Sequence, residues 1–117
     1  MANPNIVTVT SIIGKSTYAN LTTTPTDIIT NAVSSNTILK INHVTVTNFG
    51  NTSVAVTMNV IRGANTCPIT RITVPTLSSI IILSKDNSLY LEESDKISMS
   101  AGSANTLSMF ASYEIIS

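Results

Sequence analysis

Short stretches of alternating apolar and polar residues recur along this chain, with turn-forming residues between them. In the clearest stretch, residues 54–60, three valines and a methionine alternate with alanine, threonine and asparagine. A period of two places every second side chain on the same face of a β-strand. The pattern predicts about eight strands, over residues 6–13, 37–48, 54–60, 68–74, 79–83, 89–91, 97–101 and 107–115.

Three stretches depart from simple alternation. In residues 37–48 the apolar positions change parity, from Leu39 and Ile41 to Val44 and Val46, which predicts a β-bulge near Asn42 and His43 or a strand that changes sheets. Residues 17–23 form a weaker strand candidate, and residues 27–33 show helical spacing but are too short and too β-branched to favour a helix. Gly14 is expected to end the first strand.

Residues 79–83 form a nearly continuous apolar run, with Ile80, Ile81, Ile82 and Leu83 in succession. A strand that is apolar on both faces lies either between two layers or at a subunit contact. Replacing Ile82 with aspartate is therefore expected to abolish folding or assembly, because it would bury an unpaired charge.

Composition supports this interpretation and adds a feature of its own. Ile, Val and Thr together exceed a third of the 117 residues, and β-branched side chains suit a pleated sheet. We therefore predict one all-β domain over residues 1–117, a β-sandwich of jelly-roll or Greek-key type, with 1–5 as an extended N-terminal segment. Charged residues are only 10% of the chain, against about 25% in ordinary soluble domains. Such a surface is poorly defended against association, so neighbours are expected to cover it.

Several function classes have little support in the sequence. The net charge is zero and the basic residues are scattered, which argues against nucleic-acid binding. No apolar stretch is long enough to span a membrane, and the N-terminus does not resemble a secretory signal. A single cysteine builds no intramolecular disulfide framework, so synthesis in a cytoplasm is expected.

A search for reactive groups finds no catalytic constellation. His43 lies within a predicted strand, where a hydrogen-bonded side chain on the strand face is the commoner role. Cys67 has the chemistry of a nucleophile, but a buried thiol is the more frequent finding. One histidine and one cysteine are too few for a typical zinc site. We therefore predict no enzyme activity, no cofactor and no metal.

Two further groups of side chains have alternative interpretations. Glu92, Glu93 and Asp95 are candidates for a calcium site, and a solvated polar turn is the alternative. Sugar binding needs exposed aromatic rings, whereas aromatic residues are only 4% of the chain and dispersed along it. Packing within the core or a turn is therefore the expected role of Tyr18, Phe49, Tyr90, Phe110 and Tyr113.

Taken whole, the sequence resembles small virion proteins of tailed phages, notably those that infect cyanobacteria. The resemblance covers nearly the full chain and is carried by residues 14–18 (GKSTY), 21–24 (LTTT), 27–29 (DII), 89–97 (LYLEESDKI) and 112–117 (SYEIIS). These motifs consist of strand and turn residues without reactive groups. Within the fourth motif the chain has Ser94 where a turn glycine is expected.

The resemblance implies a structural role in a virion that is made in the host cytoplasm. A capsid cement or decoration protein is the favoured role, in which the chain forms a trimer or other ring and contacts the major capsid protein or another virion protein. A neck, tail or fibre-adaptor component is the alternative, and a carbohydrate-binding adhesin is a second hypothesis from fold class alone. The interface is expected to include Ile6, Val7, Val9, Ile80 and Ile82.

Overall fold

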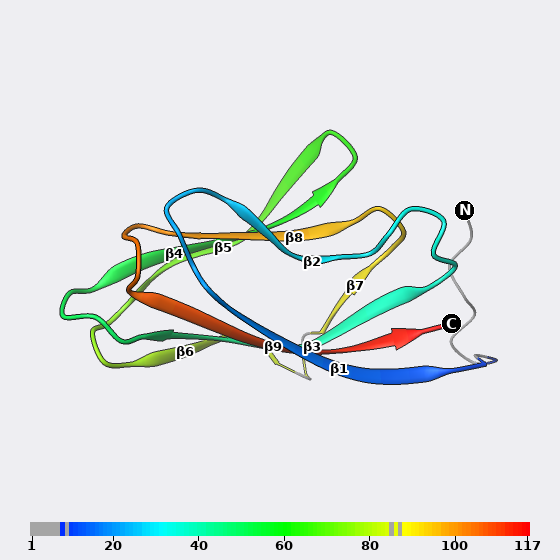
Figure 1. The fold of residues 1–117 in the computed structure, drawn as a ribbon, viewed down its shortest axis with the longest axis horizontal. Helices are drawn as coiled ribbons and strands as arrows, with labels where there is room; N and C mark the ends of the chain where they lie inside the picture. Colours follow the sequence, from blue (N-terminus) through cyan, green and yellow to red (C-terminus); the bar gives the residue numbers. More distant parts are fainter. Residues whose placement is uncertain (1–7, 9, 85, 87) are drawn as a thin grey trace.

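The computed structural model describes residues 8, 10–84, 86 and 88–117, which form a sandwich of two β-sheets (Figure 1). The regular elements of this described part are nine strands, and it contains no α-helix. Within it, therefore, no helix has the length and apolarity to cross a membrane. The predicted fold class, an all-β sandwich, is confirmed. The strands are β1 (Ile12–Asn20), β2 (Thr26–Thr30), β3 (Ile38–Asn48), β4 (Val54–Arg62), β5 (Asn65–Val74), β6 (Ser79–Leu83), β7 (Leu89–Leu91), β8 (Lys96–Ala101) and β9 (Leu107–Ile116).

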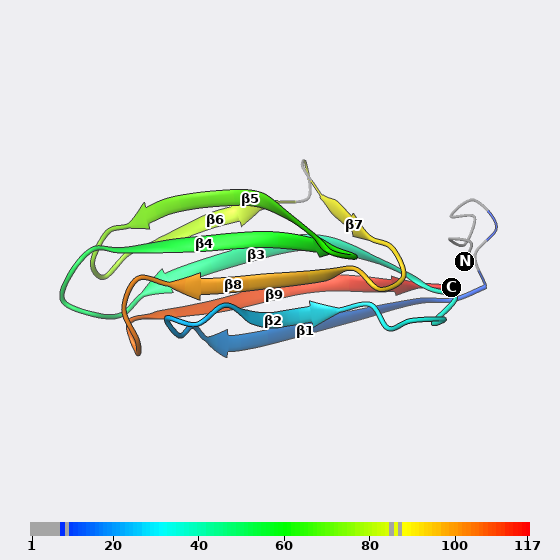
Figure 2. The same ribbon diagram turned by 90° about the horizontal axis from the view of Figure 1, so that it is seen from above.

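The strand order is that of a jelly roll. Sheet A, the lower layer in Figure 1, has the order β1-β9-β3-β6, with β7 also paired to β3; sheet B has the order β2-β8-β4-β5. The antiparallel pairs nest within one another, since β1 pairs with β9, β2 with β8, β3 with β6 and β7, and β4 with β5. The chain is thus a long hairpin rolled into two layers, the topology of a jelly roll (Figure 2).

The core lies between the two sheets and is built by the alternation that the sequence shows. In β4 the apolar residues Val56 and Met58 are fully buried, while Thr57 between them and Asn59 after them remain partly exposed. Burying one such side chain contributes about 1.5–3 kcal/mol relative to leaving it in water. The other fully or nearly fully buried side chains include Leu21, Ile41, Val44, Val46, Leu91, Ile97, Met99, Leu107 and Met109.

The predicted β-bulge in β3 is confirmed. The register of β3 against β9 shifts between Ile41 and His43, so Asn42 is the extra residue. Ile41 and Val44 are both fully buried although they have opposite parity. The bulge lets the strand keep its apolar side chains on the core face along its whole length.

The first strand differs from the prediction. β1 begins at Ile12 and continues through Gly14 to Asn20, whereas the sequence suggested a strand over 6–13 that ends at this glycine. Gly14 is exposed at the edge of sheet A, and nothing lies within 4 Å of the position that a Cβ atom would occupy. A glycine in such an open position interrupts neither the pairing nor the packing. Residues 1–7 and 9 lie outside the described part.

Two other boundaries also differ. β5 begins at Asn65 rather than at Pro68, and the proline lies beside a register shift between Met58 and Asn59 of the neighbouring strand. Proline is tolerated within an edge strand at such an irregularity. The ambiguous segment 27–33 provides most of β2, in agreement with the expectation that its β-branched residues disfavour a helix.

Candidate interaction surface

The outer face of sheet A, which points away from sheet B, carries a row of exposed apolar side chains. In the register of the sheet, Tyr18 of β1 lies opposite Phe110 of β9, Phe110 opposite Thr45 of β3, and Thr45 opposite Ile81 of β6. The exposed fractions are 78% for Tyr18, 48% for Phe110 and 63% for Ile81. We call Tyr18, Phe110 and Ile81, with the partly exposed Thr45 between the last two, the apolar stripe. Exposed apolar side chains that adjoin one another mark an interaction surface.

Polar side chains, mostly hydroxyls and amides with the imidazole of His43, border the apolar stripe on both sides. One neighbouring row runs from Asn20 through Ser108 and Thr47 to Ser79, and the other contains Ser16, Ser112 and His43. These groups form hydrogen bonds across an interface and are less costly to desolvate than charged groups. The face as a whole therefore suits contact with another protein.

The residues predicted at an interface from the sequence are not those of the apolar stripe. Phe110 lies between the buried Met109 and Ala111, so it occupies a position where the alternation expects a polar residue. An apolar residue at an outward-facing position is the signal by which the sequence alone could have indicated an interaction surface. Joining it to Tyr18 and Ile81 requires the strand order, which the sequence does not contain.

The five residues predicted at an interface have different positions. Ile6, Val7 and Val9 lie outside the described residues. Ile80 and Ile82 are partly buried and pack against the core, with Ile80 opposite the buried Val46. The exposed member of the run is Ile81, and β6 lies at the edge of sheet A.

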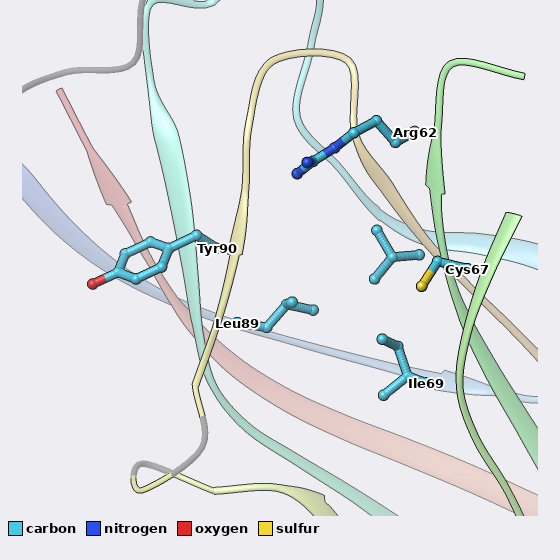
Figure 3. Close-up of a pocket in the computed structure, with 6 residues that line it drawn as sticks. Arg62, Cys67, Ile69, Leu89 and Tyr90 are labelled. Atoms are coloured by element: carbon cyan, nitrogen blue, oxygen red, sulfur yellow. The ribbon is translucent and has the colours of Figure 1, made fainter. Parts of the chain in front are cut away.

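A shallow hollow lies between the β4–β5 hairpin and β7 (Figure 3). Its volume is about 230 Å³, below the roughly 300–1,000 Å³ of typical small-molecule pockets. Cys67 lines it and is exposed, which corrects the expectation of a buried thiol. Cys67 lies on β5, an edge strand of sheet B, and lines this open hollow instead of the core. The other lining residues are Val60, Arg62, Ile69, Leu89 and Tyr90.

His43 has the structural role that the sequence favoured. It lies on the outer face of sheet A just after the bulge, and its Nε2 atom is hydrogen-bonded to the hydroxyl of Thr45. Cys67 lies on β5 of the other sheet, so the two candidate reactive groups are on different layers. This arrangement offers no nucleophile and base within reach of each other.

The three carboxylates of the β7–β8 turn have protein partners instead of facing a shared cation. Asp95 is 2% exposed and accepts hydrogen bonds from Arg62, at 3.0 Å from Nε to Oδ1 and 2.6 Å from Nη2 to Oδ2. Glu92 lies 2.8 Å from the same guanidinium, and Glu93 accepts a hydrogen bond from the backbone of Asn36. In the described part of the chain, no group of three or more His, Cys, Asp or Glu residues has the arrangement of a metal site.

This ion pair connects the end of β4 in sheet B to the turn between β7 and β8. The hydrogen bonds that Arg62 donates to Asp95, together with the negative charge of that carboxylate, raise the pKa of Arg62 above its usual value. The guanidinium therefore stays charged and holds the end of β4 against the β7–β8 turn. The predicted solvated turn is wrong for Asp95, which is buried, whereas Glu92 beside it is partly exposed.

The aromatic side chains do not gather into a sugar-binding platform. Tyr18 and Phe110 are neighbours on the outer face of sheet A, but Tyr90 is on β7 at the opposite edge of that sheet. Phe49 is half exposed in a turn, and Tyr113 packs partly against the core. Packing in the core or a turn describes Phe49 and Tyr113, whereas Tyr18 and Phe110 are surface residues.

Comparison with known proteins finds a similarity in fold and no match in sequence. No protein-family model matches the chain, and no curated protein matches it. A solved structure from Bacillus endospore appendages, described as a novel family of disulfide-linked pili, is similar with a TM-score of 0.55. The match covers 92% of this chain and 88% of the other chain, with 16% sequence identity. The two proteins thus share a fold.

Proposed function

We propose that this protein is a structural subunit of a larger assembly and works through contacts with neighbouring proteins. The observation that carries the proposal is the apolar stripe, which leaves Tyr18, Phe110 and Ile81 in water on one face of an isolated molecule. Covering these side chains stabilises an assembly by about 25 cal/mol for each Å² of apolar surface removed from water. Only 10% of the residues are charged, so electrostatic repulsion between copies of this chain is weaker than between ordinary protein surfaces.

The form of assembly that we favour is a particle such as a phage capsid, on which the chain acts as a cement or decoration protein. The support is the resemblance of residues 14–18, 89–97 and 112–117 to small virion proteins. In this proposal the chain associates with itself and with the major capsid protein or another virion protein, in a virion assembled from proteins made in the host cytoplasm. Repetition by symmetry adds many small contacts into firm attachment.

A filament subunit is the second candidate. Its support is the likeness in fold to the pilus protein of Bacillus endospore appendages, which extends over 92% of this chain. A head-to-tail contact that does not close into a ring generates a filament. Electron microscopy of the purified chain distinguishes the candidates, because a filament subunit forms fibres alone and a decoration protein forms only small oligomers without its particle.

The experiment that tests the proposed function removes the apolar stripe without touching β1. The double variant Phe110→Ser with Ile81→Ser is expected to fold normally, since both side chains are largely exposed. The variant is expected to lose binding to virion particles purified from the same phage, which co-sedimentation measures. It is also expected to lose any assembly larger than a dimer, which light scattering measures.

The matched control is Val33→Ser with Leu77→Ser. These side chains are 72% and 77% exposed and lie in loops outside the apolar stripe. The control is expected to assemble like the wild type. If the Phe110 and Ile81 variant assembles normally, the stripe is not the contact surface. Binding of the wild type to a glycan, lost in Tyr18→Ala, would instead favour an adhesin.

A further inference from the structure

The four edges of the two sheets differ in how well they are blocked against pairing with another strand. Natural proteins protect edges with short strands, prolines, bulges and charges. β2 has five residues and a register shift between Asp27 and Ile29, and β5 contains Pro68 beside its own shift. The remaining edge is divided between β6, with five residues and a shift, and β7, with three residues.

β1 has almost none of these protections. It has nine residues without a proline, pairs with β9 along its whole length without a register shift, and carries one charge, Lys15. Among the described strands it pairs with β9 alone, and Figure 2 shows it along one long side of the sandwich. Its second row of backbone N–H and C=O groups is therefore available to another strand.

We infer that β1 pairs antiparallel with β1 of a second copy of this chain, around a two-fold axis at Ser16. This inference rests on the proposed function and names the first contact of the assembly. A second copy is the matching partner because β1 is the one long, regular edge among the described strands. Two identical edges that meet across a two-fold axis form a closed dimer with one continuous sheet.

The residues of β1 favour this register over its neighbours. Ser16 is the midpoint of Ile12–Asn20, so pairing centred there uses all nine residues, and any shift leaves residues unpaired. It also places Lys15 opposite Thr17 of the other copy. A register centred on Lys15 would place two like charges directly opposite each other, which is destabilising.

The same register places Tyr18, which carries the most exposed aromatic ring, opposite Gly14, which has open space at its Cβ position. Gly14 lies opposite Tyr18 of the other copy, on the outer face of the joined sheet. Nothing lies within 4 Å of the Cβ position of Gly14, and Tyr18 is 78% exposed. An aromatic ring that packs over a cross-strand glycine stabilises a β edge. The dimer contains this contact twice.

The first test adds a charge at the two-fold axis. In Ser16→Lys the new side chains of the two copies lie directly opposite each other on the outer face of the joined sheet, so the dimer is expected to dissociate at low salt. Ser16 is exposed, so the variant is expected to keep its fold, which circular dichroism checks. Light scattering should give about twice the chain mass of 12.4 kDa for the stripe-free Phe110→Ser, Ile81→Ser background, and 12.4 kDa after Ser16→Lys is added.

Salt and a control variant separate charge repulsion from misfolding. In about 1 M salt, where the Debye length is about 3 Å, the Ser16→Lys dimer is expected to return. The control Ser53→Lys adds the same charge in an exposed loop and should remain dimeric. A dimer that survives Ser16→Lys at low salt would overturn the inference. The proposed function would then still be tested independently, by whether Phe110→Ser with Ile81→Ser loses binding to particles.

A second test examines the register itself. In a Cys67→Ser background, Ser16→Cys is expected to form a disulfide between copies, because directly opposed residues of antiparallel strands have Cα atoms about 4.5–5.5 Å apart. Asn20→Cys is the matched control, since its own counterpart lies at the far end of the paired strands. Equal cross-linking of both variants, or none at Ser16, would contradict the register.

Discussion

At the scale of residues, two buried asparagines hold the loops at the ends of the sandwich. The Asn31 amide donates to the backbone oxygens of Thr37 at 2.9 Å and Leu91 at 3.0 Å, and its oxygen accepts from Ser35 at 2.7 Å. At the other end Asn48 has an equivalent role, including a bond to Val74 at 3.0 Å. Buried amides are stable only when such partners are complete.

We expect Asn31→Ala to destabilise the fold by about 2–3 kcal/mol, because it leaves two carbonyl groups without their donor in or near the core. Denaturant unfolding followed by circular dichroism measures this change. Asn51→Ala, in an exposed loop, serves as the control and should change the unfolding free energy by less than about 0.5 kcal/mol. Equal effects of the two substitutions would refute the structural role of Asn31.

At the scale of elements, the two faces of β6 have different roles: one face packs in the core, and the other belongs to the proposed assembly surface. Ile80 faces the core opposite Val46, whereas Ile81 is 63% exposed opposite Thr45. The sequence predicts a strand here but shows four adjacent apolar residues without indicating which of them face out. Only the pairing with β3 assigns the two sides.

Aspartate substitutions at these neighbouring positions are expected to have opposite consequences. Ile80→Asp should lower the unfolding free energy by about 3 kcal/mol or more, because it places a charge against the core. Ile81→Asp should change it by about 0.5 kcal/mol or less, because that side chain points into water. Thermal unfolding of the two variants measures the difference, and similar losses in both would show that the faces are assigned incorrectly.

How much of the fold the sequence predicts depends on whether a feature is local. The alternation of β4 and the bulge at Asn42 follow from the spacing of apolar residues within a short stretch of sequence, and both predictions are confirmed. The continuation of β1 through Gly14 was missed because it depends on an open position at a sheet edge. Ser94, where a glycine was expected, has φ of 72°, so the turn does need the left-handed conformation.

At the scale of the whole molecule, the nested pairing of nine strands brings distant residues onto one face. Tyr18 and Phe110 come from opposite ends of the chain and are neighbours because β1 pairs with β9. Neither the apolar stripe nor the unprotected edge of β1 exists in the sequence as a continuous motif. The surface that we propose for assembly is therefore a product of jelly-roll topology, and sequence alone predicts only that such a surface is needed.

The most direct test of the central claim is the molar mass of the wild-type chain in solution, measured by light scattering across a range of concentrations. We predict an average mass that exceeds 12.4 kDa and rises with concentration, because the apolar stripe and the β1 edge both offer contacts to other copies. A mass that stays at 12.4 kDa at every concentration, with no binding to any particle, would contradict the account.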